Sequence, residues 1–575
     1  MSTPKEIFLE LIKPDGQPER QLKQYEALHL CLCDPINAYL RGNRKRGSIS
    51  KDRWGTTITF PEDAPGCMPL HGEGITVCPD ITRWKETVHA PDLDEACAIG
   101  WDACKDEAEK AKAEGKLLAG FMGTGIFEQC HFLMGFEDTL TNLYEHPKEM
   151  HELIEMITEY RIDYVRRLID GLKPDAIFSH DDWGTKTALF MKPDMWREFF
   201  KEPYRKFYGY IRSRGVIAIH HADSYLAPII DDMAEIGIQL WQGTLPENDI
   251  PALQRQLNGK MTLMGGFGAA IDRADATEEE ILAYARNTLK QCCPGGHFIP
   301  CITYGIPGTV YPHVNQYLDQ AIDEYNAVLH VPAAVLPPIP KRILSNKAEN
   351  AAQAEQTATE SANVIDGISS AIEQGRQKKL LALCSKALDE GYSPAEIISD
   401  GLIRGMNNLG DAFSANRAFV PEMLMAARCM NAAMELLKPL MSGESGKPIG
   451  KACLGTVKGD MHDIGKNLVK IMMEGCGIEV IDLGVDTTAE KFVETAVANG
   501  CSIIACSSLL TTTMQEMRRV VELVNECGMH DRIKIMVGGA PITQDFCDEI
   551  GADMYTPDAA AAARKAVDML TRQSA

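Results

Sequence analysis

Near the C-terminus, the motif Asp460-x-His462-x-x-Gly465 places a carboxylate two residues before a histidine and a glycine three residues after it. A neutral imidazole nitrogen is a good transition-metal ligand, and the other ring nitrogen needs a partner that fixes its tautomer. Asp460 is placed to be that partner, and Gly465 lets the next helix begin close to a bound group. Taken alone, the motif fits a loop histidine with satisfied hydrogen bonds equally well.

Two further groups follow the motif, each at the end of an apolar run. Ser507-x-Leu509 ends one run and Gly538-Gly539 ends another. The apolar runs alternate with helical segments, which predicts a doubly wound parallel sheet with its ligand at the carboxyl ends of the strands. The predicted strands are Ala452–Val457, Ile478–Leu483, Ile503–Cys506 and Ile533–Val537, with a short fifth strand near Met554.

The preceding segment, 367–441, is helical throughout. Leu380, Cys384 and Leu388 recur at helical spacing, and the stretch from Ser393 to Glu396 has the capping serine, proline and glutamate of a helix start. We expect four helices in a small bundle.

Strand-like runs and long amphipathic helices alternate through the first 330 residues, which predicts a closed parallel (β/α)8 barrel. The predicted strands are Leu117–Met122, Ala176–Ser179, Val216–Ile219, Ile238–Trp241, Thr262–Met264 and Phe298–Pro300. The predicted helices include Pro147–Gly171, Pro193–Arg214, Thr277–Gln291 and Pro312–Leu329.

Polar residues gather directly after these strands, on the face where a barrel carries its chemistry. The candidate catalytic residues are Glu128, Asp181, Asp182, His220 and His221. Carboxylates and imidazoles of this kind orient a substrate or donate a proton. The alternative is that they only pair with one another at the barrel mouth.

The whole chain is therefore predicted to be α/β, with four parts. These are a barrel (1–335), a linker (336–366), a helical cap (367–446) and a Rossmann- or flavodoxin-like parallel α/β domain (447–575). Prolines and a polar Ala/Gln/Glu/Ser/Thr stretch mark the linker, and about 30 flexible residues span roughly 30 Å.

Composition narrows the function classes. The net charge of −23 disfavours nucleic acid and anionic membrane as partners, and no apolar stretch approaches the length of a membrane span. Eighteen cysteines without a disulfide-like framework fit a reducing cytoplasm, the expected location. Cys31-x-Cys33 and Cys292-Cys293 lack metal-site spacing and are interpreted as ordinary thiols.

Residues 367–575 resemble the corrinoid proteins of methyltransferase systems and the cobalamin-binding module of methionine synthase. The resemblance implies cobalamin bound with its lower base displaced, His462 as the lower axial cobalt ligand, and Asp460 and Thr513 as its hydrogen-bonding relay. The family usually has Ser at the place of Thr513, and both residues offer a hydroxyl. The other implied cofactor contacts are Asp463, Gly465, Ser507, Leu509, Thr511, Gly538, Gly539, Tyr555 and Thr556.

The helical segment resembles the cap that covers the methyl-bearing face of methylcobalamin. Phe413 and Val420 match the positions that shield the methyl group, with Val in place of the Leu of some relatives. Adenosylcobalamin mutases share the Asp-x-His motif but lack this cap, which favours methyl transfer over radical chemistry. The alternative is a Met- and Phe-rich helix that only fills a core.

The first 330 residues resemble the uroporphyrinogen decarboxylase superfamily, including its methyltransferase branch. The resemblance is carried by 52–55, 178–184, 192–196 and 235–237. The branch that works with corrinoids binds zinc through His-x-Cys and a later Cys, whereas the matching positions here are His221, Asp223 and Cys301. Because a carboxylate replaces one thiolate, two options stay open: a harder, more Lewis-acidic zinc, or a protonated His220 or His221 without metal.

These observations predict a corrinoid-dependent methyltransferase of the EC 2.1.1 type, resembling the fused chloromethane-type enzymes. A methyl group would pass from a small donor to cob(I)alamin on the chain's own C-terminal domain, and then to a second acceptor. The expected partners are a second methyltransferase acting on tetrahydrofolate or a thiol and a reductive activase for cob(II)alamin. Methyl ethers, halides, thiols and amines all remain open as donors, with a mild preference for oxygen leaving groups.

Three alternatives remain. The barrel could pass methyl from methylcobalamin to a thiol or pterin, the chain could be a non-catalytic cobalamin-binding carrier or sensor, or it could be a decarboxylase with an appended carrier.

Overall fold

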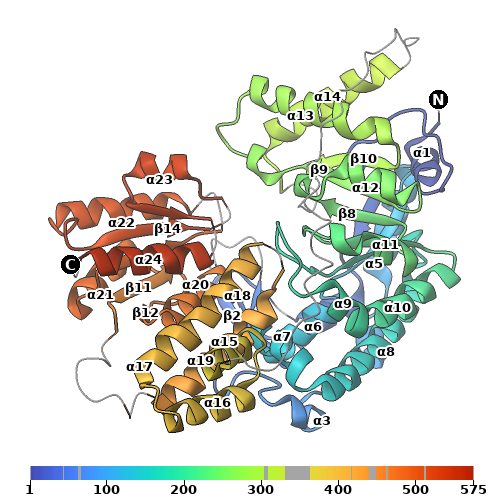
Figure 1. Cartoon of the computed structure of the whole chain (residues 1–575). Helices are drawn as coiled ribbons and strands as arrows, with labels where there is room; N and C mark the ends of the chain where they lie inside the picture. Colours follow the sequence, from blue (N-terminus) through green and yellow to red (C-terminus); the bar gives the residue numbers. More distant parts are fainter. Residues whose placement is uncertain are drawn as a thin grey trace.

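The computed structural model describes residues 2–573, apart from 43, 62–66, 303–308, 330–362, 416, 438–439, 441–447, 461–463, 510–512, 540 and 558. It shows an N-terminal α/β barrel, a helical bundle and a C-terminal α/β domain (Figure 1). The predicted α/β fold class is confirmed.

The barrel sheet contains seven parallel strands among the described residues, in the order β1-β5-β6-β7-β8-β9-β10. Their bounds are β1 Leu28–Cys31, β5 Leu117–Met122, β6 Ala176–His180, β7 Ile217–His221, β8 Leu240–Thr244, β9 Thr262–Phe267 and β10 Phe298–Ile302. The sheet curls, because Leu28 of the first strand and Ile299 of the last belong to the same inner core. No ladder between β10 and β1 appears in the described part of the chain, so seven strands stand where eight were predicted.

Helix α1 closes the bottom of the barrel. Its residues Ile7, Phe8 and Leu11 lie in the inner core. The carbonyl oxygen of Leu11 accepts a hydrogen bond from the Thr262 hydroxyl, at the start of β9. The open end of the barrel is therefore the one where the strands terminate, as expected for a parallel barrel.

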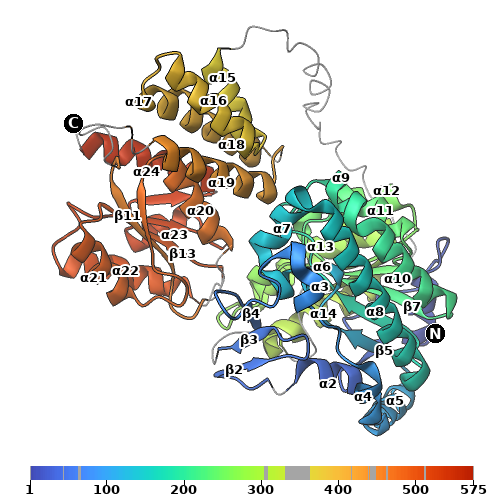
Figure 2. The ribbon, with the colours of Figure 1, turned by 90° about the horizontal axis from the view of Figure 1, so that it is seen from below.

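Helices cover the outside of the sheet and enclose a second, larger core (Figure 2). The barrel helices are α1 Pro4–Leu11, α2 Pro35–Arg41, α3 Trp84–Thr87, α4 Leu93–Ala98, α5 Asp102–Ala113, α6 Ile126–Met134, α7 Phe136–Glu145, α8 Pro147–Leu172, α9 Pro193–Trp196, α10 Glu202–Ser213, α11 Ile230–Glu235, α12 Ile250–Leu257, α13 Glu278–Cys292 and α14 Pro312–Leu329. An antiparallel sheet of β2 Ser48–Lys51, β3 Thr57–Phe60 and β4 Met68–Leu70 interrupts the pattern.

The bundle consists of α15 Val364–Glu373, α16 Gln377–Asp389, a third helix from Pro394 to Ser414, and α19 Val420–Leu437. The third helix contains α17 Pro394–Glu396, a π-helical stretch Ile397–Ile403 and α18 Arg404–Ser414. It begins with the predicted capping box, in which the Ser393 hydroxyl accepts from the Glu396 backbone N–H.

The C-terminal domain has five parallel strands in the order β12-β11-β13-β14-β15. The strands are β11 Lys451–Thr456, β12 Glu479–Asp482, β13 Ile503–Ser507, β14 Lys534–Gly538 and β15 Met554–Thr556. The helices are α20 Ile464–Gly475, α21 Ala489–Asn499, α22 Gln515–Glu526, α23 Gln544–Ile550 and α24 Ala559–Gln573. Helices α21, α22 and α23 cover one face of the sheet, and α20 and α24 cover the other (Figure 1).

The bundle and this C-terminal domain share one buried core. Met406 of the bundle lies in the same cluster as Met472 and Met473 of α20 and Leu454 of β11. We call the two together the corrinoid module, residues 364–573. Separating them would expose this apolar surface to water, which opposes large movements between them.

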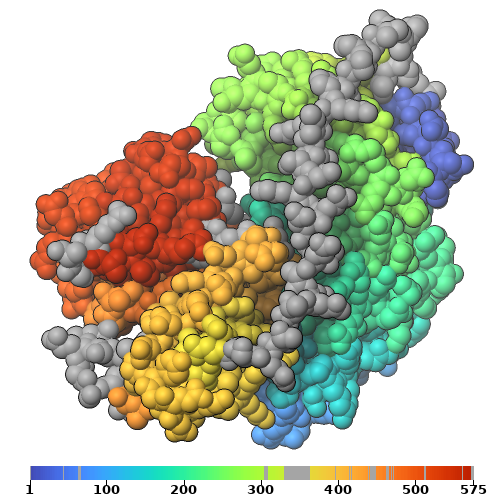
Figure 3. Space-filling view, viewed as in Figure 1, coloured from blue at the N-terminus to red at the C-terminus, as the bar shows by residue number. Residues whose placement is uncertain are grey.

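The bundle also contacts the barrel. Val420 and Leu424 of α19 belong to the buried cluster that otherwise consists of barrel residues. In the space-filling view, the yellow and orange surface of the bundle meets the cyan surface of the barrel (Figure 3).

The predicted linker falls mainly on 330–362, outside the described residues, and α15 begins at Val364. Among the described helices, none combines the length and apolarity needed to cross a membrane.

Candidate functional site

The Asp460 motif lies at the point where the strand order of the C-terminal sheet reverses. Strands β12 and β13 flank β11 on opposite sides, so the loops after β11 and β13 leave the sheet in opposite directions. The crevice between such loops is the usual ligand site of an open α/β sheet. Asp460 follows β11, and Ser508 and Leu509 follow β13, so these residues meet in that crevice.

The buried Asp460 carboxylate is held by the β13 loop. Its Oδ2 accepts a hydrogen bond from the Leu509 backbone N–H at 2.6 Å. The hydroxyls of Ser508 and Thr513 lie 3.4 and 3.3 Å from the same oxygen and 2.9 Å from each other. These donors fix the orientation of the carboxylate, which is what a partner for a metal-binding histidine requires.

Three predicted contacts fall outside the described residues: His462, Asp463 and Thr511. The axial-ligand assignment therefore remains a prediction. Ser508 was missed by the sequence reasoning, which chose Ser507 and Leu509. Strand alternation is the signal that was available, because Ser508 lies on the opposite face from those two residues and is buried.

The glycines of the motif have different local roles. A Cβ at Gly465 would meet no atom of the described residues within 4 Å, so none of them packs against this helix start. At Gly539, φ is +131° and a Cβ would lie 1.8 Å from the Ser508 carbonyl oxygen. Gly539 is thus required by the close approach of two chain segments, a reason independent of any ligand.

The remaining predicted contacts lie along the same edge. Gly538 ends β14 and is paired with Thr556 of β15, and Tyr555 precedes Thr556 on that strand. The residues present fit a cofactor with a long tail: none of those described packs against Gly465, and small residues lie along the ends of β13, β14 and β15.

The predicted cap residues lie at the contact with the barrel. Val420 is buried among barrel residues, and Phe413 is packed against both the barrel core and the module core. In this arrangement, Val420 contacts the barrel. The predicted shielding of a methyl group is not tested by these contacts.

Charged groups hold this contact in place. The Glu422 side chain, 11% exposed, receives the Lys192 ammonium at 2.8 Å and a hydrogen bond from the Tyr144 hydroxyl. Arg428 pairs with Asp138 at 2.8 Å and Glu145 at 2.9 Å, where all three groups are more exposed.

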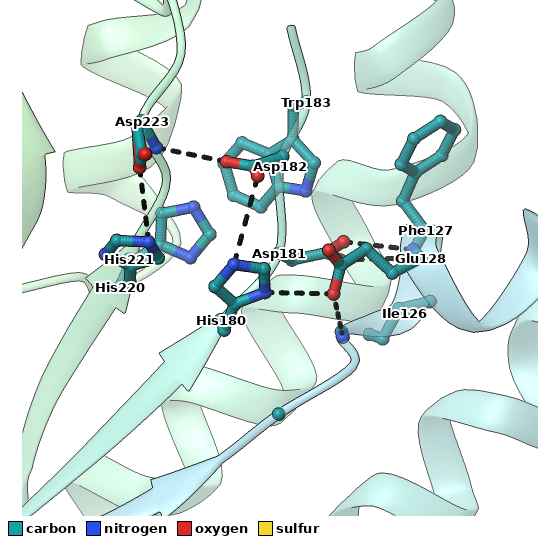
Figure 4. Close-up of polar contacts among 12 residues, drawn as sticks. Ile126, Phe127, Glu128, His180, Asp181, Asp182, Trp183, His220, His221 and Asp223 are labelled. Atoms are coloured by element: carbon teal, nitrogen blue, oxygen red, sulfur yellow. Dashed lines mark hydrogen bonds and ion pairs between the residues drawn. The ribbon is translucent and has the colours of Figure 1, made fainter. Parts of the chain in front are cut away.

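A second cluster lies at the open end of the barrel, around His180 at the tip of β6 (Figure 4). His180 Nδ1 lies 3.0 Å from Glu128 Oε2, and its Nε2 lies 3.9 Å from Asp182 Oδ2. The His180 ring stacks on His221 with 4.8 Å between ring centres. Each ring nitrogen thus faces a carboxylate, the arrangement that stabilises an imidazolium.

The carboxylates set the charge state of this cluster. Burial disfavours the imidazolium, but Glu128 and Asp182 outweigh burial and raise the pKa of His180 to about 10. Burial raises the pKa of Asp182 to about 6, although His180 opposes this. The pKa of the buried Glu128 carboxyl shifts the other way: burial alone would raise it, but the neighbouring His180 outweighs burial and lowers it.

Asp181 points away from this cluster. Its carboxylate accepts hydrogen bonds from the backbone N–H groups of Phe127 and Glu128 at 2.9 and 3.0 Å. A Cβ at Gly125 would lie 2.1 Å from Asp181 Cγ, so the approach depends on glycine. These contacts anchor the start of α6 and hence position Glu128, whereas the sequence suggested direct chemistry for Asp181.

His220 and His221 point to opposite sides of β7. The fully buried His220 stacks on Trp183 and contacts the Tyr208 hydroxyl at 2.7 Å. Burial lowers the pKa of His220 well below its usual value, so the protonated His220 considered from the sequence is disfavoured. His221 contacts Gln242 through Nδ1 and lies 3.3 Å from Asp223 through Nε2.

The predicted zinc ligands do not form a ligand set. In the described part of the chain, two groups of His, Cys, Asp or Glu bring three ligating atoms within 4.8 Å of one another. They are Glu128-His180-Asp182 and Cys31-Cys33-Cys104. Gln242 contacts both His221 and Cys301. Burial raises the pKa of the Cys301 thiol, and the His221, Asp223 and Cys301 ligating atoms are not brought together as those of the two clusters are.

His180 lies at the centre of the barrel site, but the sequence analysis assigned it no role. The polar run after this strand was noticed, but the choice fell on Asp181 and Asp182. The available signal is that His180 and Asp182 are two residues apart, and residues so spaced face the same side of an extended chain.

Comparisons with known proteins agree with this division of the chain. Residues 450–564 and 364–438 match two B12 binding domain families, and residues 52–325 match uroporphyrinogen decarboxylase (URO-D). Dimethylamine corrinoid protein 2 of Methanosarcina acetivorans is 43% identical over 208 residues, which cover 36% of this chain and 96% of the relative. Trimethylamine corrinoid protein 1 of the same organism is 42% identical over 175 residues, 30% of this chain and 81% of the relative.

Among solved structures, a chain of the methanol:cobalamin methyltransferase complex MtaBC from Methanosarcina barkeri is 29% identical, with a TM-score of 0.33. The match covers 36% of this chain and 80% of that chain.

Proposed function

The chain belongs to the corrinoid-protein family, with that module joined to a uroporphyrinogen decarboxylase-like methyltransferase domain, and we propose that the barrel moves a methyl group from a small methylated donor onto a corrinoid held by the chain's own module. The chain is a corrinoid-dependent methyltransferase. The proposal adds the direction of transfer and the class of donor.

The corrinoid, when bound, supplies a nucleophilic cobalt that accepts the methyl group. We propose that His462 holds the metal from below in place of the displaced lower base. Asp460, fixed by Ser508, Thr513 and the Leu509 backbone, would orient the His462 ring. The module contributes position and ligand strength, and the barrel contributes the chemistry of the leaving group.

The observation that carries the barrel's part is the imidazolium of His180 at the open end. A leaving oxygen that loses its methyl group gains negative charge, and a cation or proton donor at the site stabilises that charge. His180 is suited to this task because Glu128 and Asp182 keep it protonated across the neutral range. The raised pKa keeps a proton on His180 at neutral pH, where an oxygen that leaves with negative charge can take it up.

This proton favours oxygen-linked methyl groups as donors. A halide needs no proton on leaving, whereas the oxygen of a methyl ether leaves as an alkoxide or phenolate that a proton stabilises. Among the donor classes left open by the sequence, methyl ethers therefore fit the His180 cluster best.

The zinc prediction does not fit the residues as they stand. Gln242 contacts both His221 and Cys301, and the ligating atoms of His221, Asp223 and Cys301 do not cluster within 4.8 Å of one another. The proposed reaction therefore includes no zinc. His180 stabilises the leaving group, which is the role that the sequence analysis considered for zinc.

A second acceptor for the methyl group, such as a tetrahydrofolate or thiol methyltransferase, and a reductive activase remain part of the proposal. Two of the relatives described above are a dimethylamine and a trimethylamine corrinoid protein, which gives methylamines a place among the donors to be tested.

The test is anaerobic reconstitution of the full chain with cob(I)alamin, followed by aromatic methyl ethers, methyl halides, methylthiols and methylamines in turn. Loss of the cob(I) absorbance with an ether, and slower loss in His180→Gln, would support the proposal. An unchanged rate in His180→Gln, or transfer only from an amine or a halide, would refute the role of His180.

A further inference from the structure

Three cysteines meet on the outside of the barrel sheet, and neither candidate site includes them. Cys31 ends β1, Cys33 lies two residues further, and Cys104 is in the first turn of α5. The Cys31 sulfur lies 3.7 Å from the Cys33 sulfur and 4.0 Å from the Cys104 sulfur. All three sulfurs lie within 4.8 Å of one another.

These separations match those of thiolates that share one metal ion. With metal–sulfur bonds of about 2.3 Å, tetrahedral geometry places two sulfurs about 3.8 Å apart and trigonal geometry about 4.0 Å apart. A disulfide would require about 2.05 Å, so neither of these contacts is a disulfide. Two elements that are distant in sequence thus present three soft ligands at metal-binding separation.

The surroundings also suit a metal. Cys31 and Cys104 are buried, while Cys33 is half-buried and gives access from the surface. Cys104 lies at the N-terminal end of a twelve-residue helix, where the helix dipole favours a thiolate. Lys110 of the same helix is close enough to interact electrostatically with Cys33.

We propose that Cys31, Cys33 and Cys104 form a binding site for one thiophilic d10 cation, Zn²⁺ or Cu⁺, which clamps the end of β1 to the start of α5. Binding converts three thiols to thiolates, and the three protons go to the buffer. Three protein ligands leave one coordination position of a tetrahedral ion free, beside the half-buried Cys33.

Burial explains why the buried thiols become thiolates only when a metal binds. It raises the pKa of the Cys31 thiol and, together with the charge of Cys33, that of Cys104 to about 12. Without a cation, Cys31 and Cys104 therefore stay as thiols. A bound cation offsets the mutual repulsion of the thiolates, and its affinity should rise with pH.

A clamp at this place has a structural purpose. Strand β1 has four residues and pairs with β5 at the end of the described sheet order. Helix α5 contacts β1 through the hydrogen-bonded pair His29 and Glu107, 2.6 Å apart, in addition to the cysteines. A metal would add a bonded link where the sheet has the fewest backbone partners.

The test uses the full chain, reduced, stripped of metal and free of corrinoid, so that no other cobalt or zinc contributes. Zn²⁺ alone and Cu⁺ alone are added in separate arms, and bound metal is measured by elemental analysis after gel filtration. X-ray absorption at the metal edge then gives the ligand shell. The test variant is Cys33→Ser, because that residue is half-buried, and the matched control is Cys97→Ser, a half-buried cysteine outside the cluster.

We expect about one metal per chain, a shell of three sulfurs at about 2.3 Å for zinc, and loss of binding in Cys33→Ser only. Binding in only one arm would identify the cation. No binding in either arm, or equal binding in Cys33→Ser, would overturn the site. A mass two units lower with a Cys31–Cys33 disulfide, together with no metal, would instead show a redox pair and also overturn it.

Discussion

The two candidate sites lie at the same topological place, the carboxyl ends of parallel strands, but they are built from different groups. At the barrel mouth, side-chain charges contact each other directly, as His180 does with Glu128 and Asp182. Around Asp460, the contacts come from a backbone N–H group and hydroxyls. The charges at the barrel mouth thus offset one another, whereas the single Asp460 carboxylate is oriented by uncharged donors.

This difference predicts which changes affect chemistry and which affect binding. Substitutions at the barrel mouth should alter the rate of methyl transfer and leave the corrinoid in place. Substitutions around Asp460 should release the corrinoid and leave the barrel intact.

The largest expected effect is that of His180→Gln. Loss of the imidazolium should lower the rate of methyl transfer by about 100- to 10,000-fold, the usual contribution of a positioned acid. Single-turnover decay of the cob(I) absorbance measures it. The bound corrinoid spectrum should stay unchanged, and Glu137→Gln on the surface of α7 serves as a control for a lost charge. A rate within twofold of the parent would contradict the role of His180.

Asp460→Ala should have the next largest effect. Removing the partner of a metal-binding histidine usually weakens metal affinity about 10- to 100-fold. Equilibrium dialysis of the corrinoid measures it, and Thr513→Ser, which keeps the hydroxyl, should bind normally. Equal affinity in Asp460→Ala would remove the relay.

The pH dependence of methyl transfer should report the ionisation of the barrel mouth. Because the pKa of His180 is raised to about 10, its proton is present below that pH and lost above it. Because the pKa of Asp182 is raised to about 6, its carboxylate is ionised above that pH. We expect a plateau between about pH 6 and 10 with an alkaline decline that is absent in His180→Gln. An alkaline decline that persists in His180→Gln would point to another group.

The smallest expected effect on the rate belongs to Glu422→Gln, which tests the contact between barrel and bundle. Glu422 is 11% exposed and also accepts from the Tyr144 hydroxyl, but Lys192 is 46% exposed, so the variant should cost about 1 kcal/mol of contact stability. Hydrogen exchange should then accelerate in α7 and in the first turns of α19. Arg428→Gln, at a more exposed pair, should change exchange little. Equal protection in both variants would show that Glu422 does not hold the contact.

The sequence predicted the fold class and most elements, because strand and helix periods and the capping signals are local. The helix Pro312–Leu329 was predicted with its observed bounds, and Pro147–Leu172 within one residue. The short strand β1 was not predicted, since four residues carry too little pattern.

The candidate sites were predicted unequally for the same reason. The Asp460 cluster joins motifs with a characteristic local spacing, and it assembled as expected around Thr513. The barrel cluster depends on which residue of a polar run turns inward, and His180 was passed over in favour of Asp181. The cysteine cluster depends on Cys104, 71 residues after Cys33, and no local pattern reveals such a contact.

The central claim is that the barrel methylates the corrinoid carried by its own chain. The most direct measurement is the rate of cob(I) loss per chain, with an ether donor in excess, over a wide range of chain concentrations. Transfer within one chain predicts a first-order rate that stays constant on dilution. A rate that falls in proportion to the chain concentration, or no transfer at any concentration, would contradict the claim.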